Sequence, residues 1–172
     1  MPRSGPQVTQ ISLPILNRFG IFFSTIEMAD SQTLHAVVFR VGDLTCAAPA
    51  GIVREILPVL PATRIPGVSG SVDGLVNVRG ALLTVLDAHR LLGRERLAGD
   101  EGAIIVLSVG GRLCGLLVGE VRDFVELPPS AVASRERLPG VDPRIVRSVA
   151  RHGEEHFVIL DTDALLAPML GA

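Results

Sequence analysis

The chain repeats itself, and this repeat constrains its fold more than any other feature of the sequence. Each half contains two apolar runs joined by a glycine turn, a pattern typical of a β-hairpin. The turns contain Gly42 and Gly110, which lie 68 positions apart. Six further pairs match at the same spacing: Phe39 with Leu107, Val41 with Val109, Cys46 with Cys114, Val53 with Val121, Arg54 with Arg122, and Glu55 with Asp123.

The later part of each half matches at a slightly larger spacing. Residues 85–92 resemble residues 159–166, which lie 74 positions further on, and a short insertion accounts for the drift. The polar stretch 94–102 is the predicted crossing between the halves. Short strands with glycine turns favour small barrels, in which few strand edges stay exposed. The repeat therefore predicts a mainly β protein with two similar halves.

The composition restricts the chemistry that the chain can perform. Hydrophobic residues make up 48% of the chain but aromatic residues only 3%, so the predicted core is aliphatic. The formal net charge of −2 argues against nucleic acid as a partner. The 16 basic residues are all arginine, which excludes a P-loop lysine, a lysine Schiff base and a lysine general base.

Catalytic and metal-binding candidates are few. Cys46 and Cys114 each fall in an apolar run, so we expect buried, reduced and unreactive thiols. One cluster has the residue types of a metal site, but a solvated turn followed by a helix cap is the favoured interpretation. It comprises Glu154, Glu155, His156, Asp161 and Asp163. No catalytic residue, metal or cofactor is predicted.

The stretch 70–93 reads as two apolar strands, interrupted by a turn, and a short helix. Asp87 is suited to cap this helix and Gly93 to end it. Arg79 is the unusual residue, because it places a charge inside an otherwise apolar run, immediately before Gly80.

The pattern Gly74-x-x-Asn77-x-Arg79-Gly80, followed by Asp87 and by Leu91-Leu92-Gly93, resembles the signature of the CheW-like family. These are coupling proteins of bacterial chemotaxis arrays, and the same module ends the CheA histidine kinase. The resemblance covers residues 34–170. It implies two intertwined five-stranded SH3-like barrels with short capping helices, including one at the C-terminus. Thr84 stands where the family usually has proline, and Ala88-His89 where it usually has leucine and arginine.

The expected organisation is one domain behind a leading segment. Residues 1–31 are predicted to be a poorly ordered extension, and residues 32–172 to be the CheW-like domain. The first barrel is expected over approximately 44–100 and the second over 101–155, with the terminal segments completing them. The apolar run 11–26 is too short to cross a membrane, which takes about 20 residues. Residues 1–30 are expected to be dispensable.

The resemblance implies a non-enzymatic adaptor that couples methyl-accepting chemoreceptors to a CheA-type histidine kinase. The implied partners are the regulatory domain of the kinase and the cytoplasmic tip of the receptors. The implied location is the cytoplasm, at receptor arrays of the inner membrane, without direct membrane insertion. The isolated protein is expected to be a monomer. Two alternatives stay open: an adaptor of a pilus-linked or developmental chemosensory pathway, and a barrel protein that binds a small molecule.

The same resemblance selects the residues of a protein-binding surface. Glu55 and Arg79 match an acid and an arginine important for coupling, and we expect them to lie close together on one barrel. A groove between the barrels is expected to take the helical hairpin of the receptor. Val53, Ile104 and Ile105 are its candidate lining, and Gly74, Asn77 and Gly80 complete the predicted protein-binding set.

Overall fold

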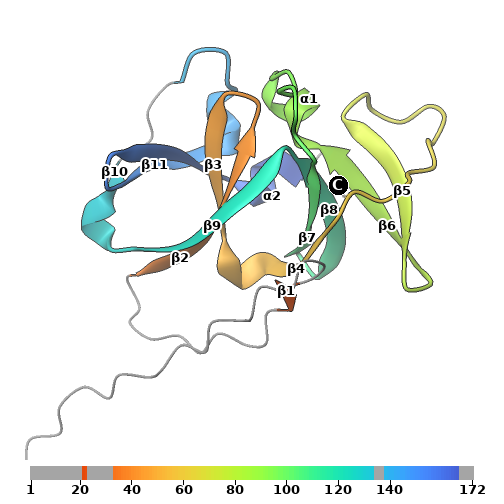
Figure 1. Cartoon of the computed structure of the whole chain (residues 1–172), viewed down its shortest axis with the longest axis horizontal. Coiled ribbons are helices and arrows are strands. Elements are labelled where there is room, and N and C mark those ends of the chain that lie inside the picture. Colours follow the sequence, from red (N-terminus) through yellow and green to blue (C-terminus); the bar gives the residue numbers. More distant parts are fainter. Residues whose placement is uncertain (1–20, 23–32, 134–137, 167–172) are drawn as a thin grey trace, which may run out of the picture.

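The structure, a computed structural model, describes residues 21–22, 33–133 and 138–166. Most of these residues lie in strands, and two short α-helices follow two of the strands (Figure 1). The strands of the first half are β2 (Leu34–Val41), β3 (Leu44–Pro49), β4 (Val53–Leu57), β5 (Val72–Val78) and β6 (Ala81–Asp87), followed by α1 (Ala88–Leu92). Those of the second half are β7 (Ala103–Val109), β8 (Arg112–Val118), β9 (Glu120–Leu127), β10 (Val132–Ala133), β11 (Val146–His152) and β12 (Glu155–Leu160), followed by α2 (Thr162–Leu166).

The strands form two sheets, and each sheet takes strands from both halves of the chain. The first sheet has the order β1-β4-β7-β8-β6-β5, where β1 is Ile21–Phe22. The second has the order β10-β11-β12-β3-β2-β9. The hairpin β2–β3 thus joins the later strands of the second half, and the hairpin β7–β8 joins the later strands of the first. The predicted intertwining is an exchange of hairpins between the repeats.

This exchange divides the chain differently from the expected barrel bounds of 44–100 and 101–155. Residues 103–118 belong with β4–β6, and β2–β3 belong with β9–β12. The order of strands along the chain cannot predict this pairing. A hairpin has the same local sequence pattern whether it joins the sheet of its own half or that of the other half.

The two sheets repeat each other residue by residue. Glu55 lies opposite Val106 in the first sheet, and its counterpart Asp123 lies opposite Val38 in the second. An irregularity in register sits at the same place in both, beside Val53 and beside its counterpart Val121. The β5–β6 and β11–β12 hairpins also pair in equivalent registers. The repeat seen in the sequence is therefore a structural duplication.

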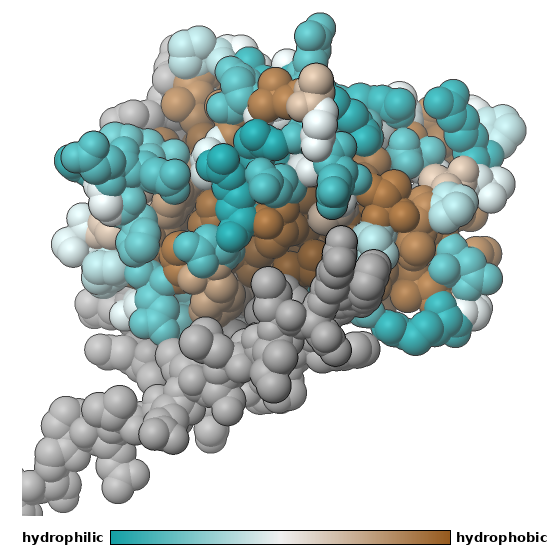
Figure 2. All heavy atoms as spheres, viewed as in Figure 1, coloured by the Kyte–Doolittle hydropathy of each residue, from teal (hydrophilic) through white to brown (hydrophobic). Residues whose placement is uncertain are grey.

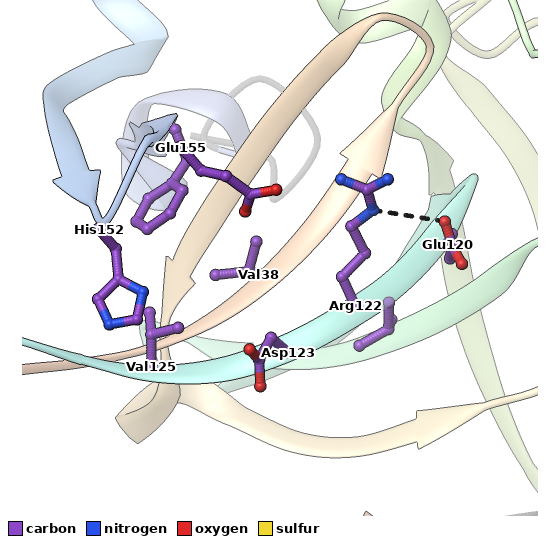
Figure 3. A pocket seen from close by; sticks show the side chains of 9 residues that line it. Val38, Glu120, Arg122, Asp123, Val125, His152 and Glu155 are labelled. Atoms are coloured by element: carbon purple, nitrogen blue, oxygen red, sulfur yellow. Dashed lines mark ion pairs between the residues drawn. The ribbon is translucent and has the colours of Figure 1, made fainter.

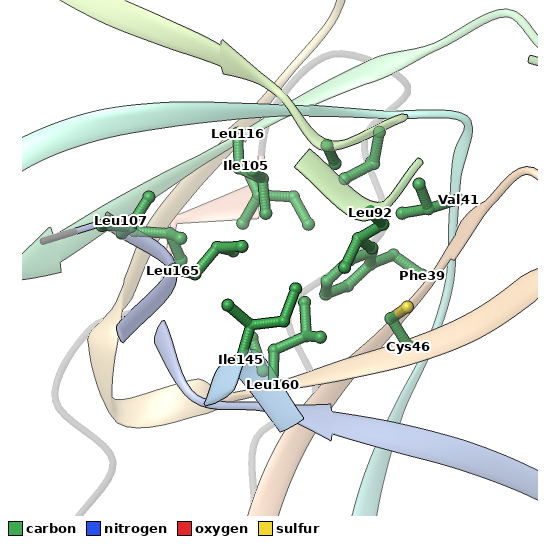
Figure 4. Close-up of a cluster of buried hydrophobic side chains, with 14 of the residues drawn as sticks. Phe39, Val41, Cys46, Leu92, Ile105, Leu107, Leu116, Ile145, Leu160 and Leu165 are labelled. Carbon is green, nitrogen blue, oxygen red and sulfur yellow. The ribbon is translucent and has the colours of Figure 1, made fainter. Parts of the chain in front are cut away.

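The core is aliphatic, as the composition predicts. Its largest cluster lies between the two sheets, and α1 and α2 contribute Leu92 and Leu165 to it (Figure 4). Two smaller clusters are separate from it: one fills the inside of the first sheet and the other the inside of the second sheet. Cys46 and Cys114 are free thiols buried in the central cluster. The central strands β2 and β7 are therefore buried on both faces, one toward the inside of their own sheet and one toward the other sheet.

Both helices have the caps that the sequence indicates. The carboxylate of Asp87 accepts a hydrogen bond from the backbone N–H of His89 at 2.9 Å, and Gly93 ends α1 with φ of 61°. At α2, the Asp161 carboxylate accepts from the N–H of Ala164 at 3.0 Å. None of the helices in the described ranges has the length and apolar character needed to cross a membrane.

The leading segment differs from expectation at two residues. Ile21–Phe22 forms β1 and pairs antiparallel with β4, with Phe22 opposite Glu55 and Ile21 opposite Ile56. These two residues therefore take part in the first sheet. The rest of the predicted extension, 1–20 and 23–31, lies outside the described residues.

Candidate protein-binding site

Arg79 and Glu55 form a two-pronged ion pair at one end of the first sheet. Nη1 of Arg79 donates to Oε1 of Glu55 at 2.8 Å, and Nη2 donates to Oε2 at 2.5 Å. This geometry matches the planar fork of arginine to a carboxylate. We call the end of the sheet that carries this pair, beside the β5–β6 turn, the first mouth. The expected proximity of the two side chains is thus present.

The two partners differ in exposure. The Arg79 side chain is 62% exposed and the Glu55 side chain only 10%. The hydrogen bond and the charge of Glu55 raise the pKa of the Arg79 guanidinium above its already high usual value. The pair therefore presents a permanently charged guanidinium to solvent, held over a nearly buried acid.

The backbone at Arg79 has an unfavourable conformation. Its φ is +50°, and no other non-glycine residue in the described part of the chain has a positive φ. Gly80 follows with φ of +87°, so both turn residues are left-handed, as in a type I′ hairpin turn. The side chain of Asn77 supports this turn by accepting from the N–H of Gly80 at 2.8 Å.

The second repeat has a different residue at the equivalent turn position. The counterpart of Arg79, 74 positions on, is Gly153, with φ of +63°. Glycine adopts this conformation without steric cost, whereas arginine does not. An arginine here works against local backbone preference, which favours a functional role for its side chain over a structural one.

Gly74 has a packing role. A Cβ atom at this position would lie 2.5 Å from the carbonyl oxygen of Thr63, closer than atoms can approach. The contact is tight because Thr63 and Leu75 exchange backbone hydrogen bonds of 2.8 and 2.9 Å. This bridge extends the first sheet beyond β5, toward the segment that follows β4.

The candidate groove residues are not at the surface. Val53 is 2% exposed, Ile104 1% and Ile105 0%. Val53 and Ile105 belong to the central cluster, and Ile104 fills the inside of the first sheet. The expectation that they line an exposed groove is therefore corrected: they support the strands beneath such a surface. Val53 lies on the buried face of β4, whose residues alternate in exposure. Alternation cannot reveal the burial of Ile104 and Ile105, because β7 is buried on both faces.

Asp87 does more than cap a helix. Its buried carboxylate also accepts from Nη2 of Arg96 at 3.1 Å and lies 3.2 Å from Nδ1 of His89. Burial alone would raise the pKa of Asp87, but the hydrogen bonds and charges of Arg96 and His89 lower it. Asp87 thereby holds the crossing segment to α1, a role that the sequence did not indicate.

The cluster near the C-terminus has the arrangement expected of a turn and a cap. Glu154 lies in the turn between β11 and β12, and Asp161 caps α2. In the described ranges, no group of three or more His, Cys, Asp or Glu residues is placed to hold a metal ion.

Comparison with known proteins agrees with this architecture. The family model of the CheW-like domain matches residues 35–168. The chain belongs to the CheW-like family. The predicted family is thereby confirmed.

Named relatives lie in several bacteria. A chemotaxis protein CheW of Rhizobium meliloti (strain 1021) is 34% identical over 116 residues, which cover 67% of this chain and 73% of that protein. Protein PilI of Pseudomonas aeruginosa is 29% identical over 137 residues, covering 78% and 76%. Protein FrzA of Myxococcus xanthus is 33% identical over 112 residues, covering 60% and 70%.

A solved structure shares the fold. The crystal structure of the scaffolding protein TtCheW from Thermoanaerobacter tengcongensis superposes with a TM-score of 0.69 at 20% identity, covering 74% of this chain and 88% of that one. The predicted fold class, mainly β with two SH3-like subdomains and short helices, is confirmed. The strand ladders of the described residues leave both barrels open.

Proposed function

We propose that this CheW-like protein is a non-enzymatic adaptor that couples chemoreceptors to a CheA-type histidine kinase. The observation that carries the proposal is the Arg79–Glu55 pair. Its arginine occupies a left-handed turn position where the other repeat has glycine, and it keeps 62% of its side chain exposed. Arginine held in this way is a favoured anchor in protein interfaces.

The surface around the barrels supports a binding role. Hydrophobic residues reach the surface in the middle of one face and to its right, and hydrophilic residues lie above them and at the outer edges (Figure 2). An apolar patch with a polar rim is a common setting for a protein partner. In the proposed assembly, one barrel packs on the homologous module of the kinase and the region between the barrels takes the receptor tip, in the cytoplasm beneath the inner membrane.

The pathway has one alternative. Relatives with the names PilI and FrzA match the chain as well as relatives named CheW do, so the same adaptor role fits a chemosensory pathway outside motility. Both versions use the same kinds of partner, a receptor and a histidine kinase, and the same surface. Pull-down with receptor and kinase fragments from each pathway would separate them.

The test is reconstitution. Purified kinase, receptor fragments and this chain should show receptor-dependent kinase activation that is absent without the chain. A small-molecule-binding barrel would neither pull down the kinase regulatory domain nor activate the kinase. If this chain does neither, the adaptor proposal is refuted.

A further inference from the structure

The duplication gives the first mouth a counterpart in the second sheet, and this counterpart is open. We call the end of the second sheet beside the β11–β12 turn the second mouth. It contains a cavity of about 340 Å³. Figure 3 shows its lining side chains, which include Asp123 from β9, His152 and Glu155 from the β11–β12 hairpin, and Val38 from β2.

Asp123 occupies the position that Glu55 has in the first mouth. The two acids lie 68 positions apart, face equivalent residues, Val38 and Val106, and sit beside the same irregularity in register. Glu55 is held by Arg79, but the counterpart of Arg79 is Gly153, which has no side chain to offer. Asp123 instead accepts a hydrogen bond from the N–H of Phe124 at 2.8 Å. Across the described residues, no arginine forms an ion pair with Asp123.

The charge of the second mouth is unbalanced. Glu120, Asp123 and Glu155 line the cavity, and Arg122 is the one arginine among its lining residues. Nε of Arg122 lies 3.5 Å from Oε2 of Glu120, at one end of the cavity (Figure 3). Nη2 of Arg40 lies 3.4 Å from the same oxygen, so both arginines are directed to Glu120. Asp123 and Glu155 also line the cavity; both are exposed, and neither forms an ion pair with an arginine of the described residues.

The floor of the cavity is apolar. Val38, Val125 and Phe157 line it and are 2%, 6% and 2% exposed. An arginine side chain suits such a site, because its carbon stem packs on apolar surface while its guanidinium meets carboxylates. Lysine matches less well, because it lacks the planar fork.

We propose that the second mouth binds an arginine side chain presented by a partner protein, in the way the first mouth binds Arg79 of the chain itself. The arginine chemistry follows from the duplication and from the charges around the cavity. The assignment of the partner as the kinase module rests on the proposed function.

The sharpest variant fills the second mouth from within. Gly153→Arg with Glu154→Gly copies the Arg79-Gly80 turn into the β11–β12 hairpin, and we expect the introduced arginine to pair with Asp123. The matched control is Gly153→Asn with Glu154→Gly, which makes a favoured two-residue hairpin turn without a cation. Asp123→Asn is a third variant that leaves the turn untouched.

The first measurement uses arginine amide as the probe and citrulline amide, which has an uncharged side chain but the same α-amino group, as the control. Nuclear magnetic resonance titration of the full chain should shift the signals of Asp123 and Phe157 with arginine amide and not with citrulline amide. The shifts should vanish in the arginine transplant and in Asp123→Asn, and persist in the Asn-Gly control. No shift with arginine amide, or equal shifts with both amides, would overturn the proposal.

The second measurement is binding of the CheW-like regulatory domain of the kinase. The arginine transplant should bind at least about ten-fold more weakly than the Asn-Gly control, the loss expected when a single hot-spot contact is blocked. Equal binding by both would overturn the kinase as the source of the arginine. If no variant binds the kinase domain, the unchanged protein included, the proposed function is refuted. The arginine amide titration would still test whether the second mouth binds an arginine side chain.

Discussion

The guanidinium of Arg79 holds both carboxylate oxygens of Glu55, at 2.8 and 2.5 Å, across the first mouth. The acid comes from β4 and the arginine from the turn after β5, 24 residues later in the chain. Arg79 makes this contact with its backbone in a left-handed conformation. The pair therefore joins two strands at the site where we propose that a partner binds.

Replacing this arginine should separate coupling from folding. Arg79→Gln keeps hydrogen-bonding capacity but removes the charge, and it should lower receptor-dependent kinase activation by about ten-fold or more, as for a single hot-spot residue. The midpoint of thermal unfolding should change little, because most of the side chain is exposed. Arg54→Gln is the matched control, since Arg54 is an exposed arginine on the same strand as Glu55. Equal activation by both variants would show that Arg79 has no role in coupling.

Gly74→Ala should destabilise the fold. The added methyl group would meet the backbone of Thr63, which cannot move without breaking the bridge to Leu75. We expect a loss of about 1–3 kcal/mol in the free energy of unfolding, typical of overpacking, measured by chemical denaturation. Gly70→Ala is the control, because a Cβ there meets no atom within 4 Å. A neutral Gly74→Ala would mean that the bridge is not required.

Asp87 should make stability depend on pH. Its pKa is lower in the folded protein than the ordinary value of 3.8, so its ionised form stabilises the fold above that value and this contribution is lost as the pH falls further. Asp87→Asn should cost about 1–3 kcal/mol at pH 7, since it weakens buried hydrogen bonds. The gap between the two proteins should narrow below about pH 4. A gap independent of pH would show that the charge of Asp87 is unimportant.

The two thiols should resist labelling. Burial raises the pKa of Cys46 to about 12 and that of Cys114 to about 11, so both are protonated at neutral pH. A thiol reagent at pH 7.5 should modify them only as fast as the chain unfolds, whereas both should react promptly in denaturant. Prompt reaction of the native protein would contradict the burial of these strands.

A chain that starts at Met28 tests the role of β1. Its thermal midpoint should stay within a few degrees of that of the full chain, because two paired residues contribute little. Glu55 and Ile56 pair with β1, and whichever of their two amides points toward β1 should exchange with solvent faster once β1 is absent. Unchanged exchange would show that β1 does not protect β4, and a large fall in the midpoint would show that residues 1–27 support the core.

The sequence alone was sufficient for the local features of this protein. The spacing of 68 residues between Gly42 and Gly110 predicted two equivalent hairpins, Asp87 and Gly93 marked the ends of α1, and the apolar runs around Cys46 and Cys114 predicted buried thiols. Each of these depends on residues close together in the chain, where hydrophobic period and turn chemistry act directly.

Only the tertiary structure decided which strands pair and which faces are exposed. The exchanged hairpins follow from packing between distant strands, for which the local pattern carries no signal. The same packing buries Val53 on one face of β4, and buries Ile104 and Ile105 on β7, whose two faces are both covered. It also sets Arg79 against Glu55 in one mouth, whereas in the other mouth the counterpart of Arg79 is Gly153 and Asp123 has no arginine beside it among the described residues. Side chains from separate strands meet only after both sheets have formed.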